Sequence, residues 1–119
     1  MFEEMRAAVF QQRSRTGSLN ALDAQTVFRM ATLGGAECLG LADHLGSLDV
    51  GKRADFVVVS LNDAAVQPVY DPIQAMVYSA SRQNIRATYI AGSEVVVDAG
   101  DLISEAALIA ERLQVSLCE

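Results

Sequence analysis

The feature that most constrains the fold is an uninterrupted apolar run, Phe56 to Val59, which follows a glycine-containing turn. Four consecutive apolar residues between turn signals predict a strand, and we expect it to extend from Ala54 to Leu61. A continuous apolar run, unlike an alternating one, is typical of a strand that is buried on both faces. We therefore expect apolar neighbours on both sides of this strand.

The turn before this strand, Gly46 to Lys52, matches most of the phosphate-binding pattern G-x-x-x-x-G-K-[ST]. Arg53, however, stands where the pattern needs a hydroxyl for Mg²⁺. A phosphate loop also lies between a strand and a following helix, whereas here a helical segment comes first and the strand second. The segment predicts a tight turn, with Lys52 and Arg53 as solvated turn residues and Asp55 holding local backbone at the strand entry.

Length and charge exclude several classes of protein. The 119 residues suffice for one domain but fall well short of the roughly 250 of an α/β barrel. A hydrophobic share of 51% indicates that some apolar surface meets a partner or a missing segment of chain. The net charge of −6, without a basic cluster, argues against nucleic acid and anionic membranes as partners. No membrane span or signal peptide is visible, so we expect a cytoplasmic chain.

The first 41 residues have the pattern of helices. Apolar residues at helical spacing predict one helix from Phe2 to about Arg13, and a second over Ala24 to Ala31 with Asn20 or Asp23 as its cap. The stretch "TLGGAECLGL" predicts a third, short helix that Thr32 caps and that Gly40 ends in the left-handed conformation.

The second half of the chain alternates strands and helices. The expected elements, besides the strand at 54–61, are a short strand at Ser47 to Asp49, a helix after Asp71-Pro72 within 71–80, a hairpin of 85–90 with 94–98, and a helix at 104–117. In the hairpin turn, Ala91-Gly92 disfavours the type I′ form, so we expect a type I turn with a glycine bulge. The chain is thus an α+β protein whose few strands form an antiparallel or mixed sheet with exposed edges.

Metal-binding and nucleophilic residues are too sparse for a catalytic site. His44 is the only histidine, whereas a catalytic zinc site needs about three protein ligands, and Cys38 and Cys118 lack the spacing of a metal knuckle and are expected to be free thiols. We therefore predict no catalytic, metal-binding or cofactor-binding residue in this chain.

Neighbouring carboxylates also have simpler structural explanations. The candidate pairs are Asp98 with Asp101, Asp55 with Asp71, and Glu3 with Glu4. Aspartates at turns commonly bond to local backbone N–H groups, and adjacent glutamates on a helix point apart. We expect local structural roles for the aspartates and a solvated face for the glutamates.

Several motifs together resemble the C-terminal part of the amidohydrolase superfamily. In order they are "MFEEMR", "RMATLGGAECLGL", "GSLDVGKRADFVVVSL", "PVYDP", "MVYSA" and "IAGSEVVVDAG". The resemblance covers about residues 1 to 100. It is strongest to the branch with cytosine-deaminase-like enzymes, S-adenosylhomocysteine/methylthioadenosine deaminases and triazine hydrolases.

This resemblance implies a fold, a chemistry and a place for each segment. Residues 1–41 would be the last helices of a metal-dependent (β/α) barrel, residues 42–100 the C-terminal part of a small composite β-sandwich with one inserted short helix at 71–80, and residues 101–119 a C-terminal helix. The family hydrolyses C–N bonds other than peptide bonds with a water activated on Zn²⁺ or a similar divalent metal. Its ligands, a His-x-His pair, two further histidines and an aspartate, have no counterpart here, so any metal belongs to the full-length parent.

Three hypotheses follow, and each implies a different partner. The chain is an inactive C-terminal piece of such an enzyme, which would meet the missing N-terminal part. Alternatively it is a freestanding interaction module that self-associates, or a subunit whose ligands come from another polypeptide. Phe2 and Met5 are candidates to border the parent's substrate pocket. We expect Met1 to be an internal methionine of an incomplete gene, with a natural start as the alternative.

Overall fold

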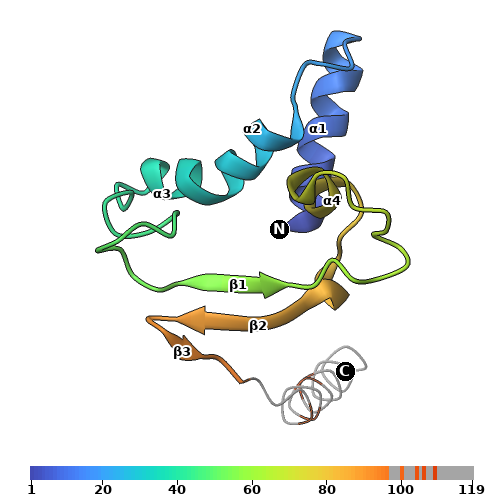
Figure 1. Cartoon of the computed structure of the whole chain (residues 1–119). Coiled ribbons are helices and arrows are strands. Elements are labelled where there is room, and N and C mark those ends of the chain that lie inside the picture. The colour runs from blue at the N-terminus through green and yellow to red at the C-terminus, as the bar shows by residue number, and fades with distance from the viewer. Residues whose placement is uncertain (97–99, 101–103, 105, 107–108, 110–119) are drawn as a thin grey trace, which may run out of the picture.

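Helices and strands lie in two separate layers, as the computed structural model shows in Figure 1. The structure describes residues 1–96 together with Gly100, Ser104, Ala106 and Ile109. The helices α1, α2, α3 and α4 form one layer, and a three-stranded sheet lies beneath them in the order β1-β2-β3. The predicted α+β class is confirmed. The predicted helix at 104–117 falls largely outside the described residues.

Helix α1, Phe2–Thr16, is confirmed and is longer than predicted. Glu3 and Glu4 lie in its first turn and basic residues lie in its last turn, which suits the helix dipole. Gly17 ends the helix with φ 68°, and its N–H donates to the carbonyl of Arg13. A glycine adopts this left-handed conformation without the steric cost that a Cβ would bring.

Helix α2, Ala24–Arg29, begins at Asp23, whose carboxylate accepts a bond of 2.7 Å from the N–H of Thr26. Asp23 is therefore the cap, and not Asn20. The prediction that the helix stops near Thr32 is wrong, because a π-helical segment, Met30–Gly34, joins α2 to α3, Gly35–Cys38. The Thr32 hydroxyl donates back to the carbonyl of Phe28 and caps nothing. Gly40 ends the run in the predicted left-handed conformation, with φ 68°.

The sheet is antiparallel and smaller than predicted. Strand β1, Phe56–Val59, pairs with β2, Ile85–Ile90, which pairs with β3, Ser93–Glu94. Ser47 to Asp49 form no strand, because they belong to a turn that side-chain bonds hold together. Among the described residues, β1 and β3 are thus the edges of the sheet.

The hairpin turn also differs from the prediction. Ala91 has φ 50° and Gly92 has φ 79°, so both central residues adopt positive φ, as in a type I′ turn, and there is no glycine bulge. Asp55 explains why an alanine tolerates this conformation: its carboxylate accepts a bond of 2.7 Å from the N–H of Ala91. The N–H of Gly92 donates to the carbonyl of Ala54. The turn is therefore fixed from the entry of β1.

Helix α4, Pro72–Tyr78, begins as predicted at Asp71, with proline in its first turn. The Asp71 carboxylate accepts bonds from the N–H groups of Ile73 and Gln74. Although α4 lies between β1 and β2 in sequence, it leaves the sheet and packs against α1 and α2 (Figure 1). The inserted helix therefore belongs to the helical layer.

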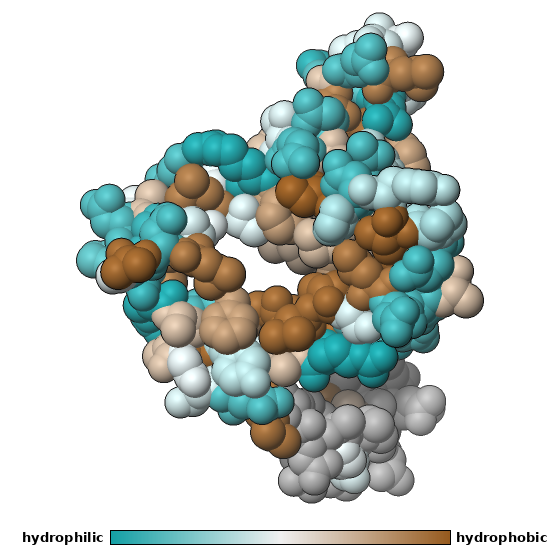
Figure 2. Space-filling view, viewed as in Figure 1, coloured by the Kyte–Doolittle hydropathy of each residue, from teal (hydrophilic) through white to brown (hydrophobic). Residues whose placement is uncertain are grey.

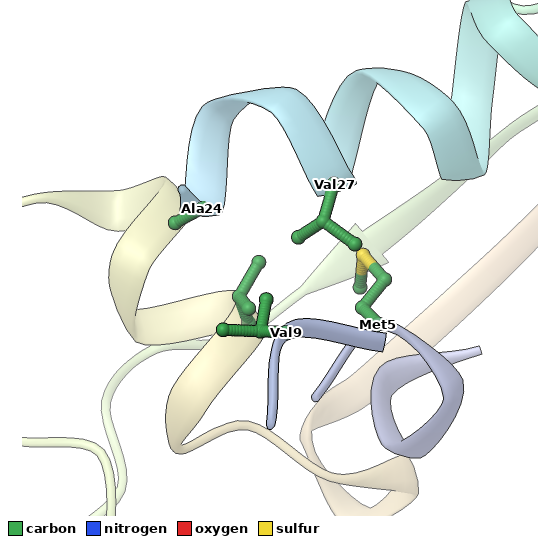
Figure 3. Packing of buried hydrophobic residues seen from close by; sticks show 5 residues of the cluster. Met5, Val9, Ala24 and Val27 are labelled. Carbon is green, nitrogen blue, oxygen red and sulfur yellow. The ribbon is translucent and has the colours of Figure 1, made fainter. Parts of the chain in front are cut away.

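The main hydrophobic cluster lies between α1, α2 and α4. Figure 3 shows Met5 and Val27 pointing toward each other, with Val9 and Ala24 beside them. Val77 of α4 is fully buried in the same cluster. No residue of β1, β2 or β3 is buried. The prediction that the run Phe56 to Val59 is buried on both faces is thus wrong for this chain.

The crossing from α4 back to the sheet has its own fixed geometry. Ser81 caps a short 3₁₀ turn, Arg82–Asn84, in a reciprocal capping box with Asn84. The buried amide of Asn84 also donates to the carbonyl of Ser60, at the end of β1. Within the part of the chain that the structure describes, no helix is long and apolar enough to cross a membrane.

Candidate functional site

The segment that resembles a phosphate loop forms a turn closed by its own side chains. The Lys52 ammonium donates to the Ser47 hydroxyl at 2.6 Å and lies 3.5 Å from the Asp49 carboxylate. The Ser47 hydroxyl in turn donates to Asp49. Only 16% of the Lys52 side chain is exposed, so the prediction of a solvated lysine is wrong, whereas Arg53 is exposed as predicted. A lysine engaged in this way has no free ammonium for a phosphate.

The same contacts determine the charge state of Asp49. The Ser47 hydroxyl and, to a smaller extent, the Lys52 ammonium hold the pKa of the Asp49 carboxyl below its usual value. Asp49 is thus an anion that accepts hydrogen bonds and has no proton to give at neutral pH. As predicted, the turn is preceded by helices and followed by β1, which is the reverse of the order in a phosphate loop.

Gly46 brings this turn against the helical layer. Its φ is 89°, and a Cβ at this position would lie 2.8 Å from both Leu33 Cα and Ala36 Cβ. Gly46 therefore permits a close approach to the π-helical segment as well as a left-handed conformation. Gly51, with φ 91°, has open space where a Cβ would be. One glycine is required by packing and conformation, the other by conformation alone.

The structure confirms the predicted role of one aspartate and contradicts that of another. Asp71 bonds to local N–H groups at the start of α4, as expected. Asp55 does not hold local backbone, because its partner Ala91 lies 36 residues further along the chain. Asp98 and Asp101 lie outside the described residues. None of these contacts brings two carboxylates together for acid–base chemistry.

The metal-binding residue types are scattered in the structure. His44 and Cys38 are both exposed, and Cys118 lies outside the described residues. Among the residues that the structure describes, no group of three or more His, Cys, Asp or Glu could hold a metal ion. These residues do not fit the zinc that the family resemblance implies, and we assign no step of a reaction to them.

The two residues that could border the parent's pocket lie in the helical layer. Met5 is only 5% exposed and belongs to the core cluster, so it packs against Val9 and Val27 and has no surface left for a substrate. Phe2 is half-buried and packs against the same cluster. Of the two, only Phe2 keeps an accessible side chain.

A hollow of about 660 Å³, lined by both polar and apolar residues, lies between α1, α2 and α4. Arg13 donates to the Tyr78 hydroxyl at 2.7 Å, and its guanidinium lies 5.5 Å from the centre of the Tyr78 ring. Asp23 in the same hollow is the cap of α2, and this bond to Thr26 N–H holds its pKa below the usual value. Arg13 Nη2 and Tyr78 are thus bonded to each other, while Arg13 Nε is buried without a hydrogen-bond partner. It contains no nucleophile with a neighbouring base.

Sequence reasoning missed the two arginines that join α1 to α4. Arg6 donates from Nε to the carbonyl of Val77 at 3.2 Å and from Nη2 to that of Ala80 at 2.8 Å. Arg13 lies seven residues later on the same side of α1 and bonds to Tyr78. The spacing of the two arginines was a visible signal, but their partners depend on α4 lying beside α1.

The exposed surface of β1 is the largest departure from an ordinary sheet. Val57 is 48% exposed on one face and Val58 is 42% exposed on the other, while Phe56 stacks on Tyr89 with 4.6 Å between ring centres. Figure 2 shows the molecule hollowed between the helices and the sheet, with hydrophobic residues around the opening. We call the two faces and the free edge of Phe56–Val59 the β1 surface. It is the candidate functional site of this chain, as an interface.

The fold and the order of these motifs belong to one family. The sequence profile of the amidohydrolase family matches residues 1–95, and the chain belongs to that family. Among curated relatives, it is 38% identical over 96 residues to a 5-methylthioadenosine/S-adenosylhomocysteine deaminase of Teredinibacter turnerae, covering 81% of this chain and 22% of the relative. A 5′-deoxyadenosine deaminase of Methanosarcina acetivorans is 36% identical, with 95% and 27% covered.

Solved structures show the same similarity. An adenosine deaminase from Xanthomonas campestris with bound zinc has a TM-score of 0.91 and 34% identity, covering 97% of this chain and 28% of that one. An atrazine chlorohydrolase from Arthrobacter aurescens, complexed with zinc, has a TM-score of 0.81 and 25% identity, covering 91% and 26%. The chain thus spans about a quarter of the length of the relatives it matches.

Proposed function

We propose that this chain forms the C-terminal part of a metal-dependent amidohydrolase that deaminates aminopurine nucleosides. In such a reaction water replaces the exocyclic amino group of the ring, and ammonia leaves. Residues 1–41 would complete the helical layer of a (β/α) barrel, and residues 42–100 would contribute strands to a composite β-sandwich. The metal, zinc or a similar divalent ion, would be held by residues outside this chain.

The observation that carries the proposal is the ranking of its relatives. The deaminases of 5-methylthioadenosine/S-adenosylhomocysteine, 5′-deoxyadenosine and adenosine are 32% to 38% identical to the chain, whereas the atrazine chlorohydrolase is 25% identical. The TM-score falls in the same order, from 0.91 for the adenosine deaminase to 0.81 for the chlorohydrolase. This ranking favours an aminopurine nucleoside over a triazine.

The chain's own part in the reaction would be structural. The hydrogen bonds from Arg6 to the carbonyls at the end of α4 hold α1 in position. The first residues of α1 include the half-buried Phe2. The described residues include no group of three or more His, Cys, Asp or Glu that could hold the metal, so the chain alone should not release ammonia from a nucleoside.

A covalent chimera tests this proposal. The matching segment of the Teredinibacter turnerae deaminase would be replaced by this chain, and the same exchange would be made in the atrazine chlorohydrolase. Each chimera is compared with its own intact host by ammonia or chloride release and by bound metal. The two hosts truncated before the exchanged segment serve as baselines.

We expect the deaminase chimera to keep its metal and the larger share of its host's activity. A deaminase chimera that is folded, yet no more active than the truncated host, would contradict the proposal. A chlorohydrolase chimera that keeps the larger share would overturn the assignment to aminopurine nucleosides.

A further inference from the structure

The free edge of β1 is short, at four residues, but it is entirely apolar. Its residues, Phe56–Val59, include no charge and no proline, and the one irregularity in its pairing lies at its end, between Val58 and Val59. Natural edge strands usually carry such features because unpaired backbone groups recruit further strands. An apolar edge without a charge or a proline can accept a further strand.

The exposed apolar surface continues onto the neighbouring strand. Ile85 is 40% exposed and Ile90 is 52% exposed at the two ends of β2, which pairs with β1. The apolar surface around β1 is therefore larger than the strand itself.

A second copy of the chain would cover this surface poorly. Two β1 strands paired through their edges would leave Val57 and Val58 exposed on opposite faces and the hollow between the layers open. Each copy would also bring a net charge of −6. A partner that covers both faces and the edge must be larger than a matching edge strand.

The long relatives indicate what such a partner is. The conformation of this chain occurs, with a TM-score of 0.91, inside an adenosine deaminase of which it spans 28%. The remainder of that deaminase chain is a partner of the required size. We call this remainder the barrel portion.

We infer that this chain binds the barrel portion of an adenosine-type amidohydrolase in trans, as a separate polypeptide, through the β1 surface. The inference rests on the proposed function and adds that no peptide bond between the two parts is needed. Its physical basis is that the helical core closes with residues of this chain alone, including the fully buried Val9 and Val77. The interface can therefore form after the helical layer.

Coexpression with a truncated relative tests the inference. The tagged chain is produced together with the Teredinibacter turnerae deaminase lacking its matching segment, and copurified barrel and ammonia release from methylthioadenosine are measured. Val58→Lys places a charge on the β1 surface, and Val50→Lys, at a fully exposed position in the turn before β1, is the matched control. Circular dichroism of the separate chains checks that both variants keep their helices.

We expect the unmodified chain and Val50→Lys to copurify with the barrel portion and to restore ammonia release. Val58→Lys should lower the recovered complex on the order of tenfold or more, since it buries an unpaired charge. Equal recovery of both variants would overturn the role of β1. If the chain bound no barrel portion but self-associated, and Val58→Lys blocked that self-association, the occupant would be a second copy. An active covalent chimera without association in trans would overturn this inference alone, while an inactive chimera would overturn the proposed function.

Discussion

The helical layer and the sheet differ in where their apolar residues find cover. Met5, Val9 and Val77 are buried among helices of the same chain, whereas every residue of β1, β2 and β3 keeps part of its surface. Strand pairing satisfies backbone groups within the sheet but does not cover its faces. The difference shows that secondary structure is complete in both layers, while a hydrophobic core is complete in only one.

The largest effect is expected at the junction of the two layers, from Gly46→Ala. The new Cβ would meet Leu33 and Ala36 at 2.8 Å and would need positive φ, so we expect a loss of about 3 kcal/mol in the free energy of unfolding. Gly51→Ala is the matched control, with nearly the same φ and open space, and should cost about 1 kcal/mol. Urea denaturation followed by circular dichroism measures both. Equal losses would show that conformation alone explains Gly46.

A pair of valines tests the comparison directly. Val77→Ala removes two buried methyl groups from the helical core and should cost about 2 kcal/mol in denaturation. Val58→Ala removes the same groups from an exposed strand position and should change the stability by less than about 0.5 kcal/mol. If the two losses were similar, the sheet would have a core of its own and the comparison would fail.

The bond from Asp55 tests how the sheet holds its shape without a core. Asp55→Ala leaves the N–H of Ala91 without its partner and should destabilise the hairpin by about 1 kcal/mol. Hydrogen exchange at the amide of Ala91 should accelerate. Asp55→Asn keeps an acceptor oxygen and should recover most of the protection. If the Ala91 amide remained unprotected in Asp55→Asn as well, a role for this bond would be ruled out.

The smallest effect concerns pH and the helical layer. The pKa of Asp23 is lowered in the folded chain by its bond to Thr26 N–H, so its contribution is present above the unfolded pKa and is lost as pH falls through the folded pKa. Asp23→Asn keeps the cap and should remove this part of the acid dependence with little change at neutral pH. Denaturation curves measured from pH 7 to about pH 3 show the difference. An unchanged acid dependence would mean that other carboxylates determine it.

Local signals predicted most elements because the responsible residues lie close together in sequence. Asp71-Pro72 placed the start of α4, and Gly40 placed the end of the helical run. The continuous helix across Thr32 was missed because a π-helical turn keeps the run unbroken at a residue that resembles a cap. The low exposure of Lys52 was missed because its partners, Ser47 and Asp49, meet it only after the turn closes.

The interface was only partly predictable. Sequence composition indicated surplus apolar surface, and the run Phe56 to Val59 indicated the strand, but burial is a property of whatever packs against it. The Asp55–Ala91 bond spans 36 residues and needs the hairpin in place before it can be recognised. Contacts between distant segments depend on the order of the strands, which no local pattern contains.

The position of α4 between β1 and β2 in the chain has a consequence for limited proteolysis. The connection from β1 to α4 is largely exposed from Asn62 to Ala65, where a protease can cut. The N-terminal piece would hold α1 and β1, and the C-terminal piece α4 and β2, so each piece carries part of both layers. A nicked chain should therefore stay together as a complex of two pieces, held by the bonds of Arg6 and by the β1–β2 ladder.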